Sequence, residues 1–231
     1  RLRGDTTVIW IPACAGMTGK TAEMRGTSML FYDSPNPAPN PRRVRIFAAE
    51  KGIELPSKEV SIPKREQKAE DFVAKNPRGQ TPILELDDGK VIAESVAIMR
   101  YLEGLHPEPP LFGATPLESA QVEMWSRRIE LNLMTAVGAV WVHTHRFTAA
   151  LPGRNEAWGE ANRPRVADAF RFFDQSLAGR DFLATDGYSV ADILLLTTAD
   201  FAEFIGCGMP QDCENLRDWH QRVSARPSAQ A

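Results

Sequence analysis

The chain has 231 residues, 43% of them hydrophobic and 25% charged, which is ordinary for a soluble globular protein of one or two domains. The formal net charge of −3 gives no basic excess for binding nucleic acid or an anionic membrane, and no apolar run reaches the length of a membrane span. Cys14, Cys207 and Cys213 have neither CxxC nor metal-ligand spacing. Three such cysteines fit a reducing cytoplasm better than a disulfide-stabilised domain, and no metal site is expected.

Residues 1–28 differ from the rest of the chain. They show no sustained helical or strand period, and their one apolar patch, VIWI, is too short for the core of a signal peptide. The phrase GMTGKT is similar to a phosphate-binding loop, but its first glycine stands one position too close to the following GKT. We expect this segment to be a disordered or non-native extension, with a natural start at Met29.

Strand-like and helix-like segments alternate over the next 77 or so positions, and their order is strand–helix–strand–helix–strand–strand–helix. The predicted elements are a strand at 29–32, a helix at 42–51 that ends at Gly52, a strand at 53–62, a weak helix around 71–73, a hairpin of two strands at 83–92 and a helix from 94 to about 105. This order is that of a thioredoxin-like α/β domain.

The stretch 76–103 carries the densest signal. Pro82 stands at the start of the strand-like run TPILEL, where a proline needs a special geometry because it cannot donate to a sheet ladder. A cis bond before it would leave the backbone N–H and C=O of Thr81 free for a ligand. An Asp-Asp-Gly hairpin signal follows. Glu94 and Ser95 then begin an amphipathic helix, where they offer a carboxylate, a hydroxyl and free backbone N–H groups. This set suits a ligand that carries a carboxylate and an ammonium at one end.

The combination of QTP, a D-D-G hairpin and AESVAIMRYLE resembles the glutathione-binding half of the glutathione S-transferase family, and the resemblance extends over the whole chain beyond residues 1–28. It implies a thioredoxin-like glutathione-binding domain at 29–105, a linker at 106–116 and an all-helical domain at 117–231. It also implies a cytoplasmic, homodimeric detoxification enzyme with glutathione as co-substrate. The residues implied to hold glutathione are Gln67, Lys68, Gln80, Thr81, Pro82, Glu94 and Ser95. The alternatives are an ordinary helix cap at Glu94-Ser95 and a solvated turn at Gln67-Lys68.

The position that usually activates the thiol is occupied by Ala38, which has neither hydroxyl nor thiol. Nearby substitutes are the hydroxyl of Ser34 and the amide and backbone N–H of Asn40, whereas the strand parity of Tyr32 indicates the core of the sheet. The segment APNPRRVRIFAAEKG resembles most a fungal and bacterial subgroup, typified by a yeast glutathione transferase, that lacks the usual Ser, Tyr or Cys. In that subgroup, backbone N–H groups or a held water activate the thiol. An alanine at this position also argues against a mixed-disulfide reaction with the protein's own cysteine.

The second half of the chain is helical in pattern. The predicted helices are 117–146, 156–178, one that starts at 189, and 213–224. Ser189 to Asp192 is a capping-box variant before the most apolar helix, which indicates a structural role. The electrophile pocket is expected between the first domain and the long helix, near Arg128, Thr135 and Trp141.

Three side chains of the long helix are candidates to hold an activating water: Thr135, His143 and His145. A lone histidine is more often a packed or solvated residue. The function predicted from the sequence is conjugation of glutathione to small hydrophobic electrophiles. The alternatives are a non-catalytic glutathione-binding or scaffold protein, and a glutathione-dependent isomerase or dehalogenase, which usually has serine or cysteine in place of Ala38.

Overall fold

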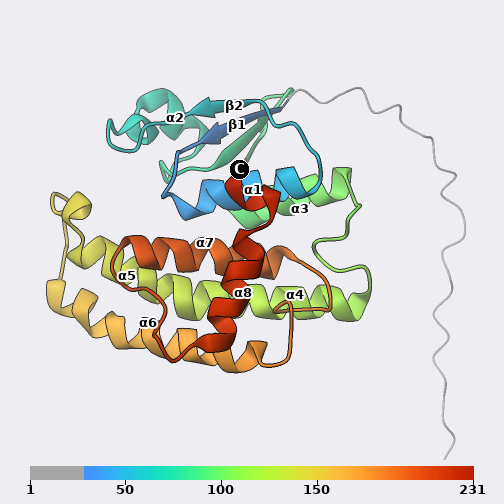
Figure 1. Cartoon of the computed structure of the whole chain (residues 1–231). Coiled ribbons are helices and arrows are strands. Elements are labelled where there is room, and N and C mark those ends of the chain that lie inside the picture. The colour runs from blue at the N-terminus through green and yellow to red at the C-terminus, as the bar shows by residue number, and fades with distance from the viewer. Residues whose placement is uncertain (1–28) are drawn as a thin grey trace, which may run out of the picture.

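The computed structural model describes residues 29–231; the expectations for residues 1–28 and for Cys14 therefore lie outside the described part. A four-stranded sheet forms one layer, and a bundle of helices forms the other (Figure 1). The strand order is β2-β1-β3-β4. The strands are β1 (Met29–Asp33), β2 (Ser57–Glu59), β3 (Ile83–Leu86) and β4 (Val91–Ala93). Only the β1–β2 pair is parallel, so the sheet is mixed.

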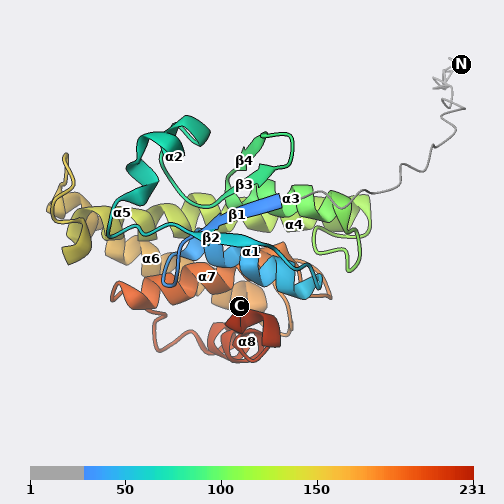
Figure 2. The same ribbon diagram turned by 90° about the horizontal axis from the view of Figure 1, so that it is seen from above.

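The helices of this half follow the predicted order: α1 (Pro39–Glu50), α2 (Glu70–Lys75) and α3 (Ser95–Leu105). Figure 2 shows α1 and α3 beneath the sheet, on the side that faces the bundle. The strand expected over 53–62 is shorter in the structure, where only residues 57–59 form a strand, β2, which pairs with β1. The first helix begins three residues earlier than the predicted Arg42, because Pro39 fits the first position of a helix.

The predicted long helix over 117–146 is present as continuous helix from Pro116 to Thr144, but its middle is a π-helix that the sequence did not predict. The helical half consists of α4 (Pro116–Arg128), the π segment (Ile129–Met134), α5 (Thr135–Thr144), α6 (Glu156–Leu177), α7 (Val190–Phe204), α8 (Glu214–Ser224) and a closing 3₁₀ turn (Pro227–Gln230). The thioredoxin-like α/β layer followed by a helical layer confirms the predicted fold class.

Helix α7 is the centre of the bundle, and twelve of its fifteen residues are buried. The predicted capping box is present, with Asp192 fully buried. Its carboxylate accepts hydrogen bonds from the backbone N–H groups of Leu183 and Ser189, from the Ser189 hydroxyl and from the indole N–H of Trp219.

Among the helices of residues 29–231, none is long and apolar enough to cross a membrane.

Candidate functional site

A cavity of about 730 Å³ opens where the two layers meet. It takes its walls from the N-terminal turns of α1 and α3 and from α4 with the π segment. Its lining residues are Asn40, Arg43, Glu94, Ser95, Val96, Ala97, Arg100, Glu123, Arg127, Glu130 and Met134. Neither α1 nor α3 has an acidic residue in its first turn, so both helix dipoles present positive ends that suit an anion.

The start of α1 offers few donors. Ala38 is the N-cap and provides no side-chain cap. Of the first three helical residues, Pro39 and Pro41 have no N–H, so Asn40 has the only one. That N–H makes no hydrogen bond to another described residue, and Asn40 lines the cavity. Main-chain donation at this helix end therefore depends on Asn40.

The backbone has special geometry at two places near the cavity, just before β3 and at the start of α3. The Thr81–Pro82 bond is cis, as expected, and the backbone of Thr81 makes no hydrogen bond to another described residue. Glu94 has a left-handed φ of 70°, which is uncommon for a residue with a side chain and recurs at ligand sites. Glu94 is exposed, whereas the adjacent Ser95 is 5% exposed at the base of the cavity.

Arg43 is the functional candidate that sequence reasoning missed. It is buried among hydroxyl groups: its guanidinium donates to Thr197 and Thr198 at 3.3 and 3.1 Å and lies 3.5 Å from the Ser95 Oγ. The burial lowers the pKa of Arg43 to about 10, so it stays a cation at neutral pH. Its one carboxylate neighbour, Glu130, is 3.6 Å away. Its spacing of four residues from the buried Phe47 places it on the inner face of α1, but nothing near it in the sequence identifies the hydroxyl groups that surround it.

Glu130 reaches the cavity from the other layer through the π segment. Its carbonyl accepts from the backbone N–H of Thr135, five residues on, which is the spacing of a π turn, and the Thr135 hydroxyl donates to the same carbonyl. π turns within α-helices are frequent at functional sites. The cavity wall thus includes the carboxylates of Glu94, Glu123 and Glu130 and three arginines, of which only Arg43 is buried.

Ser34, proposed from the sequence as a thiol donor, is 1% exposed. Its hydroxyl donates to the carbonyl of Val60 at 2.9 Å and lies 2.8 Å from the Oγ1 of Thr81. It therefore contacts the side chain of Thr81, and it does not line the cavity. Tyr32 is buried in the sheet, where its hydroxyl donates to Glu85, as its strand parity predicted.

The residues proposed for the glycyl end of glutathione lie together beside the turn at 76–80. The Lys68 ammonium donates to the carbonyl of Arg78, and the Gln80 side-chain oxygen accepts from the Arg78 guanidinium. The side-chain oxygen of Gln67 is buried and has no partner among the described residues. That oxygen is free to accept from a ligand N–H, rather than to bind a carboxylate.

This cavity is not lined by Arg128, Thr135 or Trp141, which were expected near the electrophile, or by His143, a candidate to hold the activating water. Arg128 lies over the rings of Trp125 and Phe172, toward α6. The hydroxyl of Thr135 is turned back to the helix, as described above. The imidazole of His143 accepts from the backbone N–H of Asn155.

Trp141 belongs to an aromatic cluster at the ends of α5 and α7, which consists of Trp141, His145, Phe147, Phe201 and Phe204. Phe147 is 65% exposed and Phe204 41% exposed, so the cluster has an open face. On α7, Asp200 directly precedes Phe201 of the cluster and forms an ion pair with Arg42 of α1. Burial and the neighbouring Arg146 lower the pKa of His145, which favours the neutral ring.

Comparison with known proteins agrees with this architecture. The family profile described as "Glutathione S-transferase, N-terminal domain" matches residues 38–105, and "Glutathione S-transferase, C-terminal domain" matches residues 133–227. The chain belongs to the glutathione S-transferase family.

Individual relatives share most of their length with this chain. Glutathione S-transferase 2 of Saccharomyces cerevisiae is 38% identical over 207 residues, 87% of each protein. The crystal structure of Gtt2 from Saccharomyces cerevisiae has a TM-score of 0.82 and 36% identity, and it covers 87% of this chain and 98% of that one. A glutathione S-transferase domain-containing protein from Marinobacter aquaeolei has a TM-score of 0.82 and 39% identity, with 86% and 98% covered. The expected resemblance to the subgroup typified by a yeast transferase is confirmed.

Proposed function

We propose that the protein conjugates the thiolate of glutathione to small hydrophobic electrophiles. The observation that carries the proposal is the cavity in which the N-terminal turns of α1 and α3 converge with the buried cation of Arg43 and with the carboxylates of Glu94 and Glu130. The cytoplasmic location and the detoxification role implied by the family are part of the same proposal.

The γ-glutamyl end of glutathione is a zwitterion, and the cavity has complementary charges. The α-carboxylate is expected at Ser95, whose hydroxyl and N–H lie at the start of α3 with the Arg43 guanidinium behind them. The α-ammonium is expected between the carboxylates of Glu94 and Glu130. The Thr81 backbone would bind the cysteinyl unit, and Gln67 with Lys68 would bind the glycyl end.

Activation of the thiol is assigned to the backbone N–H and side chain of Asn40. A free thiol has a pKa of about 8.5, and lowering it by two units takes about 2.7 kcal/mol. A charge-assisted hydrogen bond from an N–H contributes roughly 1.5–3 kcal/mol, and a helix N-terminus adds roughly 0.3–1 kcal/mol. The sum reaches the required range without a side-chain hydroxyl at Ala38.

The electrophile is expected on the open face of the aromatic cluster, on the helix α7 that also pairs with α1 through Asp200 and Arg42. Aromatic rings offer a large apolar surface to a flat, hydrophobic substrate. There the thiolate attacks the electrophilic carbon, the new C–S bond forms, and the leaving group departs with the bonding electron pair. The thiol proton has already passed to solvent when the thiolate formed.

The test is an ultraviolet titration of the thiolate of bound glutathione, combined with conjugation of an aryl halide. Asn40→Ala keeps the backbone N–H, and Asn40→Pro removes it, so the pair separates main chain from side chain. We expect a thiol pKa well below the free value in the wild type, a small rise in Asn40→Ala and a large rise in Asn40→Pro. Ser34→Ala is expected to change the thiol pKa little, because that hydroxyl is engaged with Val60.

Two outcomes would redirect the assignment. If glutathione binds with an unshifted thiol and no conjugate forms, the alternative of a non-catalytic glutathione-binding protein takes over, since a fold does not guarantee chemistry. If Ser34→Ala raises the thiol pKa as much as Asn40→Pro does, the activating donor is the serine hydroxyl.

A further inference from the structure

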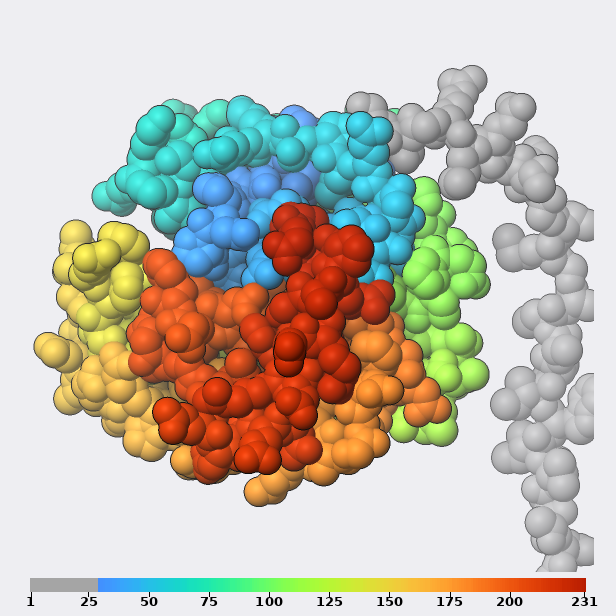
Figure 3. All heavy atoms as spheres, viewed as in Figure 1, coloured from blue at the N-terminus to red at the C-terminus, as the bar shows by residue number. Residues whose placement is uncertain are grey.

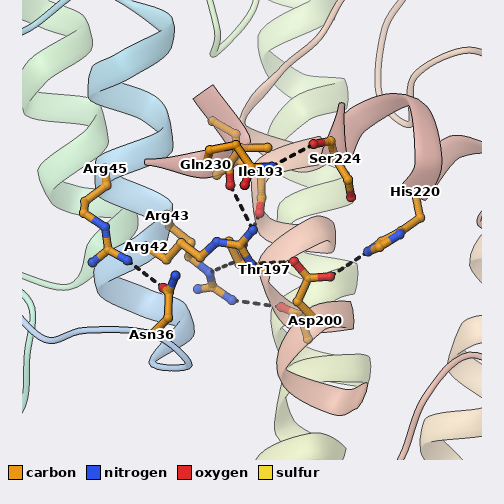
Figure 4. Close-up of polar contacts among 12 residues, drawn as sticks. Asn36, Arg42, Arg43, Arg45, Ile193, Thr197, Asp200, His220, Ser224 and Gln230 are labelled. Carbon is orange, nitrogen blue, oxygen red and sulfur yellow. Dashed lines mark hydrogen bonds and ion pairs between the residues drawn. The ribbon is translucent and has the colours of Figure 1, made fainter. Parts of the chain in front are cut away.

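Helix α1 is fastened to the helical layer near its start by a chain of polar contacts. The Nη1 of Arg42 lies 2.5 Å from Asp200 on α7, and the other oxygen of Asp200 lies 2.6 Å from the Nε2 of His220 on α8. The Nη2 of Arg42 also donates to the carbonyl of Ala229 at 3.1 Å. Figure 4 shows Asp200 between the side chains of Arg42 and His220. These contacts hold the pKa of Asp200 below its usual range, although burial alone would raise it.

The far end of α1 is fastened in a similar way. Arg226 donates two hydrogen bonds to Glu50, at 2.8 and 2.7 Å, and the hydroxyl of Ser228 bonds the same carboxylate. The C-terminal segment therefore lies along α1, as Figure 3 shows for the red segment across the blue one. The two attachments resemble each other in chemistry, but only the first is next to the cavity.

The ion pair between Arg42 and Asp200 lies close in the chain to Asn40, the donor proposed for the thiol. Arg42 is two residues after Asn40, so the ion pair with Asp200 sets the direction of the first helical turn. Because Pro39 and Pro41 have no N–H, no neighbouring donor in the first three positions can compensate if Asn40 turns away. We propose that Asp200, braced by His220, is a positioning residue that directs the Asn40 N–H toward the thiol of bound glutathione. This inference rests on the proposed function above.

Asp200 could act on the bound thiol through its charge or by holding the first turn of α1, and the two roles predict opposite shifts of the thiol pKa in Asp200→Asn. The substitution keeps the size of the side chain but removes its negative charge, and it leaves Arg42 as an uncompensated cation near the start of α1. If Asp200 acted only through its charge, the thiol pKa would fall, because the added positive field favours a thiolate. If Asp200 acts by holding the helical turn, the thiol pKa rises, because the Asn40 N–H is no longer directed at the sulfur.

The experiment is the thiolate titration on Asp200→Asn, with Glu50→Gln as the matched control. We expect Asp200→Asn to raise the pKa of the bound thiol by about one pH unit, a roughly tenfold smaller thiolate fraction at acidic pH. His220→Asn should give a smaller rise of the same sign. Glu50→Gln breaks the comparable attachment at the far end and should leave the thiol pKa unchanged. A fall or no change in Asp200→Asn, or an equal rise in Glu50→Gln, would overturn the proposal.

A second readout on the ligand-free protein keeps this inference separate from the proposed function. In hydrogen–deuterium exchange, Asp200→Asn should speed exchange in the first turns of α1, near Arg43 to Arg45, and Glu50→Gln should speed it only at the far end. If the wild type does not shift the thiol pKa but this exchange pattern is found, the proposed function fails and the positioning of α1 stands. Unaltered exchange near Arg43 in Asp200→Asn contradicts the positioning itself.

Discussion

At the scale of single residues, Arg43 is the side chain whose removal should separate binding from folding. Arg43→Met replaces a buried cation by an apolar side chain of similar length. Its partners keep other contacts, because the Thr197 and Thr198 hydroxyls also donate to main-chain carbonyls and Glu130 stays 25% exposed, so we expect the fold to persist. Glutathione loses a charge-assisted contact behind Ser95, so we expect its dissociation constant to rise roughly 10- to 100-fold. Calorimetric titration with glutathione measures the change, and urea unfolding checks the fold.

Arg100→Met is the matched control for this prediction. Arg100 lines the same cavity, but it is exposed and pairs with Glu123 at the surface. Surface pairs contribute roughly 0–1 kcal/mol, so glutathione affinity should change less than about fivefold. Equal losses in both variants would mean that the cavity responds to net charge and that the placement of Arg43 is unimportant.

The two capping boxes provide a second residue-scale prediction. Asp192 is buried with four donors around its carboxylate, whereas Glu118 caps α4 together with Thr115 at the surface. Asp192→Asn points an amide N–H group at those donors, so we expect a loss of about 3 kcal/mol in the free energy of unfolding. Glu118→Gln should cost less than about 1 kcal/mol in the same urea titration. Similar losses would contradict a role for burial.

Sequence reasoning at this scale succeeded where a residue had to satisfy a backbone rule. Pro82 at the mouth of a strand predicted the cis bond, and the spacing of Ser189 and Asp192 predicted the capping box. It did not succeed where a side chain depended on a partner distant in the chain. Arg43 is buried because Thr197 and Thr198 surround it, about 150 residues away, and no local pattern contains that information.

At the scale of elements, the attachment of α1 predicts a stability that depends on pH. Burial alone would raise the pKa of Glu50, but the hydrogen bonds from Arg226 and Ser228 lower it below its usual range. A lowered carboxyl pKa stabilises the folded state above the unfolded pKa, about 4.3, and this contribution is lost as the pH falls through the folded value. At pH 7 we therefore expect Glu50→Gln to be less stable than the wild type by about 1–3 kcal/mol.

The pH series supplies the check. The unfolding free energies of Glu50→Gln and the wild type should converge as the pH falls below 4, because the wild-type carboxyl is then protonated as well. A difference that stays constant down to pH 3 would show that the ionised carboxylate is not responsible.

The order of elements was predictable because strand and helix periods are local properties of the sequence. The ends of the elements were less predictable than their order. Strand β2 forms only over 57–59, because just those residues pair with β1. The π segment at 129–134 was not predictable, because its apolar spacing continues that of an α-helix and the difference lies in backbone bonding. Since that segment brings Glu130 to the cavity, part of the site was hidden for the same reason.

At the scale of the whole molecule, the exposed apolar residues of α4 and the π segment support the homodimer implied by the family. Leu117, Met124 and Leu131 are seven residues apart and are 70%, 40% and 65% exposed. Apolar residues at this spacing suit a helix–helix contact. We propose that a second copy of the chain covers them and expect Leu131→Glu to shift the protein from dimer to monomer. Light scattering coupled to size exclusion gives the mass.

Leu151→Glu is the control for that measurement, because Leu151 is also exposed but lies in the loop before α6. It should leave the mass of the wild type unchanged. A wild type that elutes with the mass of one chain at micromolar concentration would refute the dimer, and a dimeric Leu131→Glu would place its interface elsewhere.

The prolines that flank Asn40 have a consequence for how such proteins are classified. The donor proposed for the thiolate belongs to the main chain, and every amino acid except proline supplies it. An alanine scan across 34–45 would therefore find no essential hydroxyl, and a search for a catalytic Ser, Tyr or Cys would classify the chain as inactive because of Ala38. A chemistry that depends on a helix end tolerates exchange of almost any side chain there, so its absence cannot be inferred from a missing side chain.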